Sequence, residues 1–282
     1  MRILVPLDGS LLAERAIAPA AMLAHRSDTT ASITLLWVDT LHQTQATVAE
    51  EFSADVAANV VDRTPQHLLY LARMRDLPAL LQIDVSIQLV AGEPAPTIAR
   101  VAGEQQFDLI VMASHVLTAF DAAMWGSVTE TVARTSTVPT LIIRPEGPAF
   151  PDVAHVNPFS ILVPLDETAF AEAALPGALL LAQAFRGEIL LYHVIPPAAA
   201  QGHRDEAAYA YLDRIATRLA GSGVMVDRLL GHGNIATSIA ALMLENRADV
   251  VAIATHGDDK FSIAENVLHH ITAPMIVVHP TH

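Results

Sequence analysis

The feature that most constrains this chain is a repeat within its own sequence. The six residues Ile3–Asp8 recur letter for letter at Ile161–Asp166. Two further pairs of segments follow in the same order: Asp108–His115 resembles Asp249–His256, and Val138–Pro145 resembles Ala273–Pro280. Self-similarity that keeps its order along a chain indicates repeated structural units. We therefore expect two copies of one fold, the second shortened just after His256.

The length and the connecting stretch agree with two domains. A chain of 282 residues is long for one domain. The stretch 146–158 holds three prolines and a glycine, a composition typical of an irregular connection between domains. We predict a first domain over 1–147, a linker over 148–158 and a second, degenerate domain over 159–282.

Short runs rich in valine, isoleucine and leucine alternate with alanine-rich stretches. The runs are apolar on both faces, as buried parallel strands require. The expected strands are Ile3–Leu7, Ile33–Val38, Val85–Val90, Leu109–Ala113 and Thr140–Ile143, then Ile161–Leu165, Ile189–Val194, Val224–Leu230, Val250–Ala254 and Met275–Val278. The expected helices of the first copy are Leu11–His25, roughly Glu50–Arg75, Pro96–Glu104 and Val128–Arg134. This alternation predicts an α/β fold of two tandem, five-stranded, parallel open sheets flanked by helices, Rossmann-like in design. Pro19 and Pro176 are expected to kink the first helix of each copy.

Composition excludes several classes of function. Acidic residues outnumber basic ones 30 to 16, which gives a net charge of −14 and disfavours nucleic acid and anionic membranes as partners. Cysteine is absent, so disulfides, thiolate catalysis and cysteine-ligated metals are excluded. No uncharged apolar stretch reaches the ~18 residues of a membrane helix. We expect a cytoplasmic protein.

Four segments of the first copy are candidates for binding: Pro6–Ser10, Val38–Thr40, Met112–Val116 and Gly126–Val128. Ligands of open parallel sheets bind beyond the carboxyl ends of the strands. Asp8 follows the first strand, where a carboxylate can accept hydrogen bonds from sugar hydroxyls; alternatively, Asp8 or Ser10 only caps the next helix. Gly126 and Ser127 open another helix, whose N-terminus favours anions. Ser127 with Glu130 is also a capping box, and both interpretations can hold together.

The order and spacing of these segments, found twice, resemble the universal stress protein family in tandem form. The resemblance covers nearly all of both copies and rests on Ile3–Ser10, Ala91–Pro94, Asp108–His115, Gly126–Val132 and the strand after Val138. It implies a stress-response protein that binds an adenine nucleotide (ATP, ADP or AMP). The implied nucleotide-binding residues are Pro6, Leu7, Asp8, Val38, Met112, Ala113, Val116, Gly126, Ser127 and Val128.

The ATP-binding signature of the family is damaged in both copies. It reads Gly, two residues, Gly, nine residues, then Gly-Ser or Gly-Thr, and its two early glycines are here Ala113 and Val116. A β-branched residue resists both positive φ and close approach to phosphate. In the second copy Phe261 stands where Gly126 stood, on a shortened loop. We therefore expect weak binding, in the first copy only.

Other functions have less support. Family members without the full glycine signature are taken to act through protein contacts, so the alternative function is a ligand-free interaction scaffold. An enzyme of the related adenine-nucleotide hydrolases is disfavoured because its Ser-Gly-Gly-x-Asp-Ser motif is absent, and we expect no catalytic residues. No metal site is expected either, since the adjacent His269 and His270 would point about 100° apart on a helix. The resemblance also implies a pseudo-dimer within the chain, paired through Thr140–Arg144 and Met275–His279, with room for further self-association.

Overall fold

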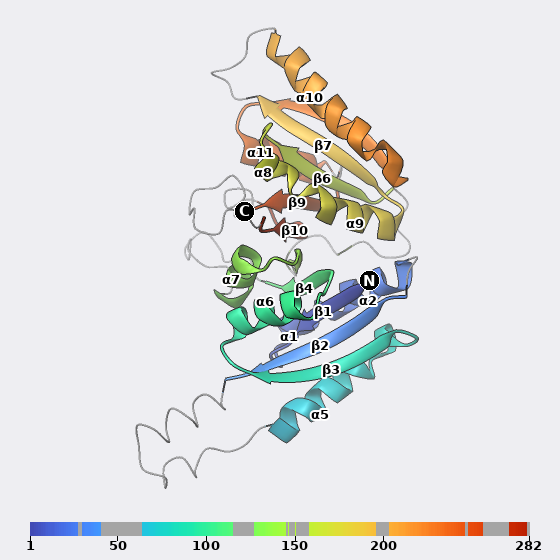
Figure 1. The fold of residues 1–282 in the computed structure, drawn as a ribbon, viewed down its shortest axis with the longest axis vertical. Coiled ribbons are helices and arrows are strands. Elements are labelled where there is room, and N and C mark those ends of the chain that lie inside the picture. Colours follow the sequence, from blue (N-terminus) through green and yellow to red (C-terminus); the bar gives the residue numbers. More distant parts are fainter. Residues whose placement is uncertain are drawn as a thin grey trace, which may run out of the picture.

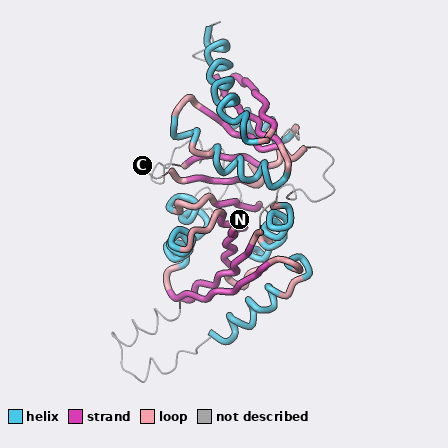
Figure 2. Tube along the Cα trace, turned by 45° about the vertical axis from the view of Figure 1, so that its right-hand side comes forward, coloured by secondary structure: helices cyan, strands magenta, loops and turns pink. Residues whose placement is uncertain are grey.

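The two halves of the chain share one continuous sheet of ten strands. A computed structural model describes residues 1–27, 30–40, 64–114, 127–144, 146, 150, 158–195, 203–245, 248–255 and 271–280. The strand order is β3-β2-β1-β4-β5-β10-β9-β6-β7-β8. All neighbouring strands are parallel except β5 and β10, and helices lie on both sides of the sheet (Figures 1 and 2). The expected α/β architecture is confirmed.

We refer to the elements up to β5 as domain 1 and to those from β6 onward as domain 2. The elements of domain 1 are β1 (Arg2–Pro6), α1 (Leu11–Glu14), α2 (Ile17–Arg26), β2 (Ser32–Asp39), α5 (Thr64–Arg75), the 3-10 turn η1 (Pro78–Leu80), β3 (Asp84–Ala91), α6 (Pro94–Glu104), β4 (Leu109–Ala113), α7 (Ser127–Thr135) and β5 (Thr140–Ile143). Those of domain 2 are β6 (Ser160–Leu165), α8 (Ala169–Glu172), α9 (Leu175–Phe185), β7 (Glu188–Ile195), α10 (His203–Leu219), β8 (Met225–His232), α11 (Ile235–Leu244), β9 (Val250–Ala254) and β10 (Met275–Val278).

The expected strands lie within two residues of the observed ones at each end, because their apolar runs are the buried core itself.

The first helix of each copy differs from expectation. It is divided in two, α1 and α2 in domain 1 and α8 and α9 in domain 2, and each break comes a few residues before the proline. Pro19 and Pro176 therefore lie in the first turn of the second helix, where the missing N–H has no partner to lose. Of the predicted helix 50–75, residues 50–63 lie outside the described residues.

The two domains join through their last strands. β5 and β10 pair antiparallel, with Leu141 opposite Ile276 and Ile142 opposite Met275. The side chains of all four residues are fully buried. On one face of the sheet a single apolar cluster runs from Ile3 through Leu141 and Ile276 to Ile161, so the core continues across the junction. This confirms the predicted pairing of the last strands, and it protects two edges that would otherwise be exposed.

One difference between the halves, at a matched position in the second strand, changes the packing around it. Leu36 of β2 lies opposite Pro6, and Tyr192 of β7 lies opposite the equivalent Pro164. The Tyr192 ring reaches over Gly231 of β8, where a Cβ atom would come within 2.0 Å of the tyrosine hydroxyl. Burial raises the pKa of Tyr192, so its hydroxyl stays protonated. Gly231 thus provides the space that this larger side chain occupies.

No helix among the described residues is both long and apolar enough to span a bilayer.

The junction between the domains can be tested by removing one side chain. Replacing the buried Ile276 by alanine leaves a cavity at the paired strands, and we expect the free energy of unfolding to fall by about 2–5 kcal/mol. Leu81→Ala is the control, because Leu81 is 64% exposed and should change stability by no more than about 0.5 kcal/mol. Chemical denaturation followed by circular dichroism measures both. Equal, small effects would show that the junction is not part of the core.

The Tyr192–Gly231 contact can be tested by a double-mutant cycle. Gly231→Ala should destabilise the protein by about 1–3 kcal/mol, because the added methyl group collides with a buried ring. In a Tyr192→Leu background the same change should cost almost nothing, since the ring is gone. Denaturation midpoints of the four proteins give the coupling. The same loss in both backgrounds would contradict the predicted collision.

Candidate functional site

A cavity of about 380 Å³ lies at the carboxyl ends of β1, β2 and β4 in domain 1. The strand order reverses between β1 and β4, and the crevice at such a reversal is where open α/β sheets bind ligands. The volume is within the range of small-molecule sites. The residues that line it are Pro6, Leu7, Asp8, Ser10, Leu12, Ala13, Leu36, Val38, Pro94, Ile98, Met112, Ala113, Ser114, Val128 and Thr129.

Seven of the ten residues predicted for the nucleotide site line this cavity. They are Pro6, Leu7, Asp8, Val38, Met112, Ala113 and Val128, and they come from three strands, the loop after β1 and one helix. Ser127 is the first residue of α7, but its side chain is outside the described part. Val116 and Gly126 also lie outside the described residues, so the two halves of the proposed phosphate loop remain predictions.

Sequence reasoning missed several other residues of the lining. Leu36 precedes Val38 by two residues and so faces the same side of β2, which strand alternation could have indicated. Pro94 and Ile98 are four residues apart on α6, on one helical face. Which of the several apolar helix faces meets this end of the sheet depended on the tertiary packing.

The loop after β1 separates the two roles proposed for Asp8 and Ser10. The Ser10 hydroxyl accepts a hydrogen bond from the Ala13 N–H at 3.1 Å, so Ser10 is the helix cap. Asp8 accepts one hydrogen bond through Oδ1, from the Ser10 N–H at 2.9 Å, and is exposed at the mouth of the cavity. Gly9 between them has φ +81°, a conformation that favours glycine. The capping interpretation therefore applies to Ser10 and leaves Asp8 available to a ligand.

The cavity wall is apolar with a few hydrogen-bonding groups. These are the hydroxyls of Ser10, Ser114 and Thr129 and the carboxylate of Asp8; the described lining includes no lysine or arginine. Arg144 directly follows Ile143, whose carbonyl oxygen accepts a hydrogen bond from the Ser114 N–H at 3.0 Å. Burial lowers the pKa of Arg144 to about 10, so it still carries a positive charge at neutral pH. The wall thus favours a largely apolar group, and among the described elements an anion would rely on the N-terminus of α7.

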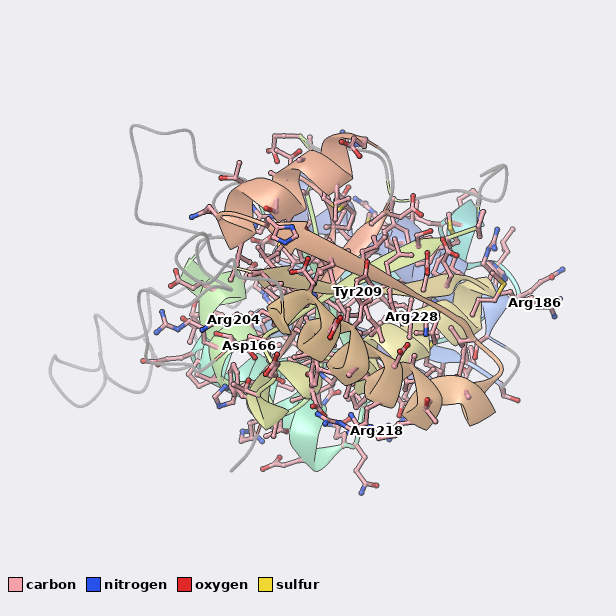
Figure 3. All side chains as sticks on the ribbon, turned by 90° about the horizontal axis from the view of Figure 1, so that it is seen from above. Asp166, Arg186, Arg204, Tyr209, Arg218 and Arg228 are labelled. Atoms are coloured by element: carbon pink, nitrogen blue, oxygen red, sulfur yellow. The ribbon has the colours of Figure 1, made fainter. Side chains whose placement is uncertain are left out.

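A tyrosine–glutamate hydrogen bond holds the first helix of each domain. The Tyr70 hydroxyl, from α5, donates to Oε1 of Glu14 in α1 at 3.1 Å. The Tyr211 hydroxyl, from α10, donates to Oε1 of Glu172 in α8 at 3.2 Å. Burial and the neighbouring glutamate raise the pKa of both tyrosines, which keeps the donating protons in place. In domain 2, Arg218 also forms an ion pair with Glu172 at 2.7 Å. Arg218 is labelled in Figure 3, which views the domain 2 end of the molecule.

Domain 2 repeats the first loop with changed surroundings. Asp166 Oδ1 accepts a hydrogen bond from the Thr168 N–H at 3.1 Å, just as Asp8 accepts one from the Ser10 N–H. Tyr192 replaces the cavity-lining Leu36, and Glu167, with φ +69°, replaces Gly9. Phe261 and the shortened loop around it lie outside the described residues.

No cluster of three histidines or carboxylates that could hold a metal ion occurs within the described ranges. His269 and His270 are not among them.

Comparison with known proteins identifies the family. The model of the universal stress protein family matches residues 1–144 and 159–279. A universal stress protein from Archaeoglobus fulgidus DSM 4304 has a similar structure, with a TM-score of 0.71 and 20% identity over 99% of this chain and 96% of that one. A functionally unknown protein from Pseudomonas aeruginosa PAO1 gives a TM-score of 0.64 and 16% identity over 99% and 92%.

No match was found among the curated proteins. The two matched segments span most of the sequence, one in each domain, and the solved structures share the fold over almost their full length. The chain belongs to the universal stress protein family.

Proposed function

We propose that this protein is a non-catalytic stress-response protein that binds an adenine nucleotide weakly, in domain 1 only. The observation that carries the proposal is the cavity at the β1–β4 reversal. It brings together seven residues that the family resemblance had implied for a nucleotide, from positions spread over more than 120 residues of sequence. A nucleobase suits its apolar wall, and the Asp8 carboxylate is positioned to accept hydrogen bonds from ribose hydroxyls.

The phosphate half of the site supports weak rather than tight binding. α7 begins at Ser127 and offers the N–H groups of a helix N-terminus to an anion. The signature glycines that would allow close backbone contact are replaced by Ala113, in the buried strand β4, and by Val116. A ligand with fewer phosphates needs less of this half, so AMP and ADP should lose less affinity than ATP.

The absence of catalysis is inferred from the chemistry of the lining. Hydrolysis of a phosphoanhydride needs a positioned base or a metal ligand near the phosphates. Among the described lining residues, Asp8 is the single ionisable group. It lies at the ribose end of the site in this proposal, and so we assign it to binding.

A ligand-free interaction scaffold is the second candidate function. The observation that favours it is the damaged signature of both copies: the first has lost both early glycines, and in the second Phe261 stands where Gly126 stood, on a shortened loop. The two functions differ in a single measurable property, namely whether domain 1 takes up nucleotide.

Isothermal titration calorimetry with AMP distinguishes the two functions. We expect no more than one site per chain. Asp8→Asn should weaken binding by about 10- to 100-fold, because a hydrogen bond to a charged group is lost. Asp166→Asn, the same change in the equivalent loop of domain 2, is the matched control and should leave AMP binding unchanged. Two sites per chain, or equal losses in both variants, would contradict a site confined to domain 1.

Restoring the glycines should strengthen ATP binding. The double variant Ala113→Gly, Val116→Gly is expected to bind ATP about tenfold or more tightly than the parent, because backbone N–H groups regain access to phosphate. Circular dichroism checks that the variant stays folded. If a folded variant gains no affinity, domain 1 is not a latent ATP site and the scaffold function replaces the one proposed.

A further inference from the structure

The loop that carries Asp8 rests on an aromatic side chain. Trp37 is on β2 between Leu36 and Val38, so its indole faces the opposite side of the sheet from the cavity wall. A Cβ atom built on Gly9 would lie 3.3 Å from Cη2 of the indole. The backbone of the Asp8–Ser10 loop therefore lies directly against the ring, and any shift of Trp37 changes where Asp8 is presented.

Helix α5 holds Trp37 in place from the other side. The His67 imidazole stacks on the indole with ring centroids 4.1 Å apart and an interplanar angle of 20°. Tyr70, one turn later, meets the same indole edge-on at 5.6 Å and donates its hydroxyl to Glu14 of α1. One helix thus supports the loop at its base, through Trp37, and at its far end, through α1.

The His67 imidazole also lies beside a buried carboxylate. Its Nδ1 atom is buried and makes no hydrogen bond among the described residues. It lies 3.7 Å from Oδ2 of Asp39, a carboxylate whose side chain is 3% exposed. The imidazole is therefore packed between the indole face and this carboxylate, which fixes its position on Trp37.

Domain 2 keeps the tyrosine–glutamate hydrogen bond but lacks the stack of an imidazole on an indole. His193 stands in place of Trp37 and its Nδ1 atom is 2.8 Å from the Leu165 carbonyl oxygen. The matched Tyr70 and Tyr211 align α5 with α10, which puts Ala208 in place of His67. Ile195 ends β7 where Asp39 ends β2. The stack is confined to the domain with the described cavity, which suggests a role in that site rather than in the fold common to both.

We propose that His67 and Trp37 are positioning residues for the nucleotide site of domain 1, and that their stack holds the Asp8 loop in the position from which Asp8 binds the ligand. The inference rests on the proposed function, because it concerns the same cavity. Neither side chain lines the cavity, so both act through the Asp8 loop.

The binding experiment uses adenosine, which tests the nucleoside part of the site without the phosphate loop. Its affinity is measured by calorimetry on the full chain. His67→Ala removes the stacked ring and should weaken adenosine binding by about two- to tenfold. His67→Phe keeps an aromatic ring on Trp37 and should bind adenosine as the parent does. Leu69→Ala, an exposed position on the same helix, is the control and should behave as the parent.

A second measurement reads the stack without any nucleotide. The chain has two tryptophans, so Trp125→Phe leaves Trp37 as the sole reporter. Its emission should shift to longer wavelength in His67→Ala, because the indole loses the ring that covers it, and should match the parent in His67→Phe. If the emission of His67→Ala does not shift, or if His67→Phe loses as much adenosine affinity as His67→Ala, the proposal is overturned. If the emission shifts but neither adenosine nor AMP binds the parent, it is the proposed nucleotide function that fails, and with it the positioning role.

Discussion

The antiparallel pairing of β5 with β10 is the constraint on which the rest of this structure depends. Each domain alone would be a five-stranded sheet whose last strand, buried and apolar, ends at an open edge. Joining the two edges merges the sheets and lets one apolar cluster extend through both domains on the side of α2 and α9. Because β5 and β10 run in opposite directions, the two domains face opposite ways along the sheet. The crevices at their two strand reversals are consequently separated, and each is free to change independently.

That independence is visible in the side chains. Both domains keep two hydrogen bonds around the first loop. An aspartate accepts one from the backbone N–H of the residue two positions later, and a tyrosine donates the other to a glutamate of the following helix. The residues around these two hydrogen bonds differ between the domains. Domain 1 has Leu36 at the cavity and Trp37 under Gly9, whereas domain 2 has Tyr192 over Gly231 and a histidine bound to the loop carbonyl. A duplicated backbone thus supports a cavity in domain 1 and a larger side chain at the equivalent position of domain 2.

The amount that could be predicted differed between the fold and the site. The strands were located to within two residues because runs such as Leu109–Ala113 are buried on both faces and must be apolar throughout. The helix breaks near Pro19 and Pro176 were foreseen only as kinks, since the proline ring allows either a bend or a new first turn. For the cavity, the family resemblance supplied Pro6, Val38 and Met112, but no local pattern marked Pro94, Ile98 or Thr129, which come from helices packed over the sheet.

The sequence by itself determined the duplication, the α/β class and the strands, because these follow from a repeat and from local periodicities of hydrophobicity. It also determined the position of Asp8 at the end of the first strand. Only the tertiary structure decided that Trp37, His67, Tyr70 and Glu14 meet around one loop, since they come from three elements that are far apart in the chain. The physical reason is that a side-chain stack depends on the distance and angle between packed elements. Periodicity assigns a residue to a face, and the packing of that face against another decides which side chains touch.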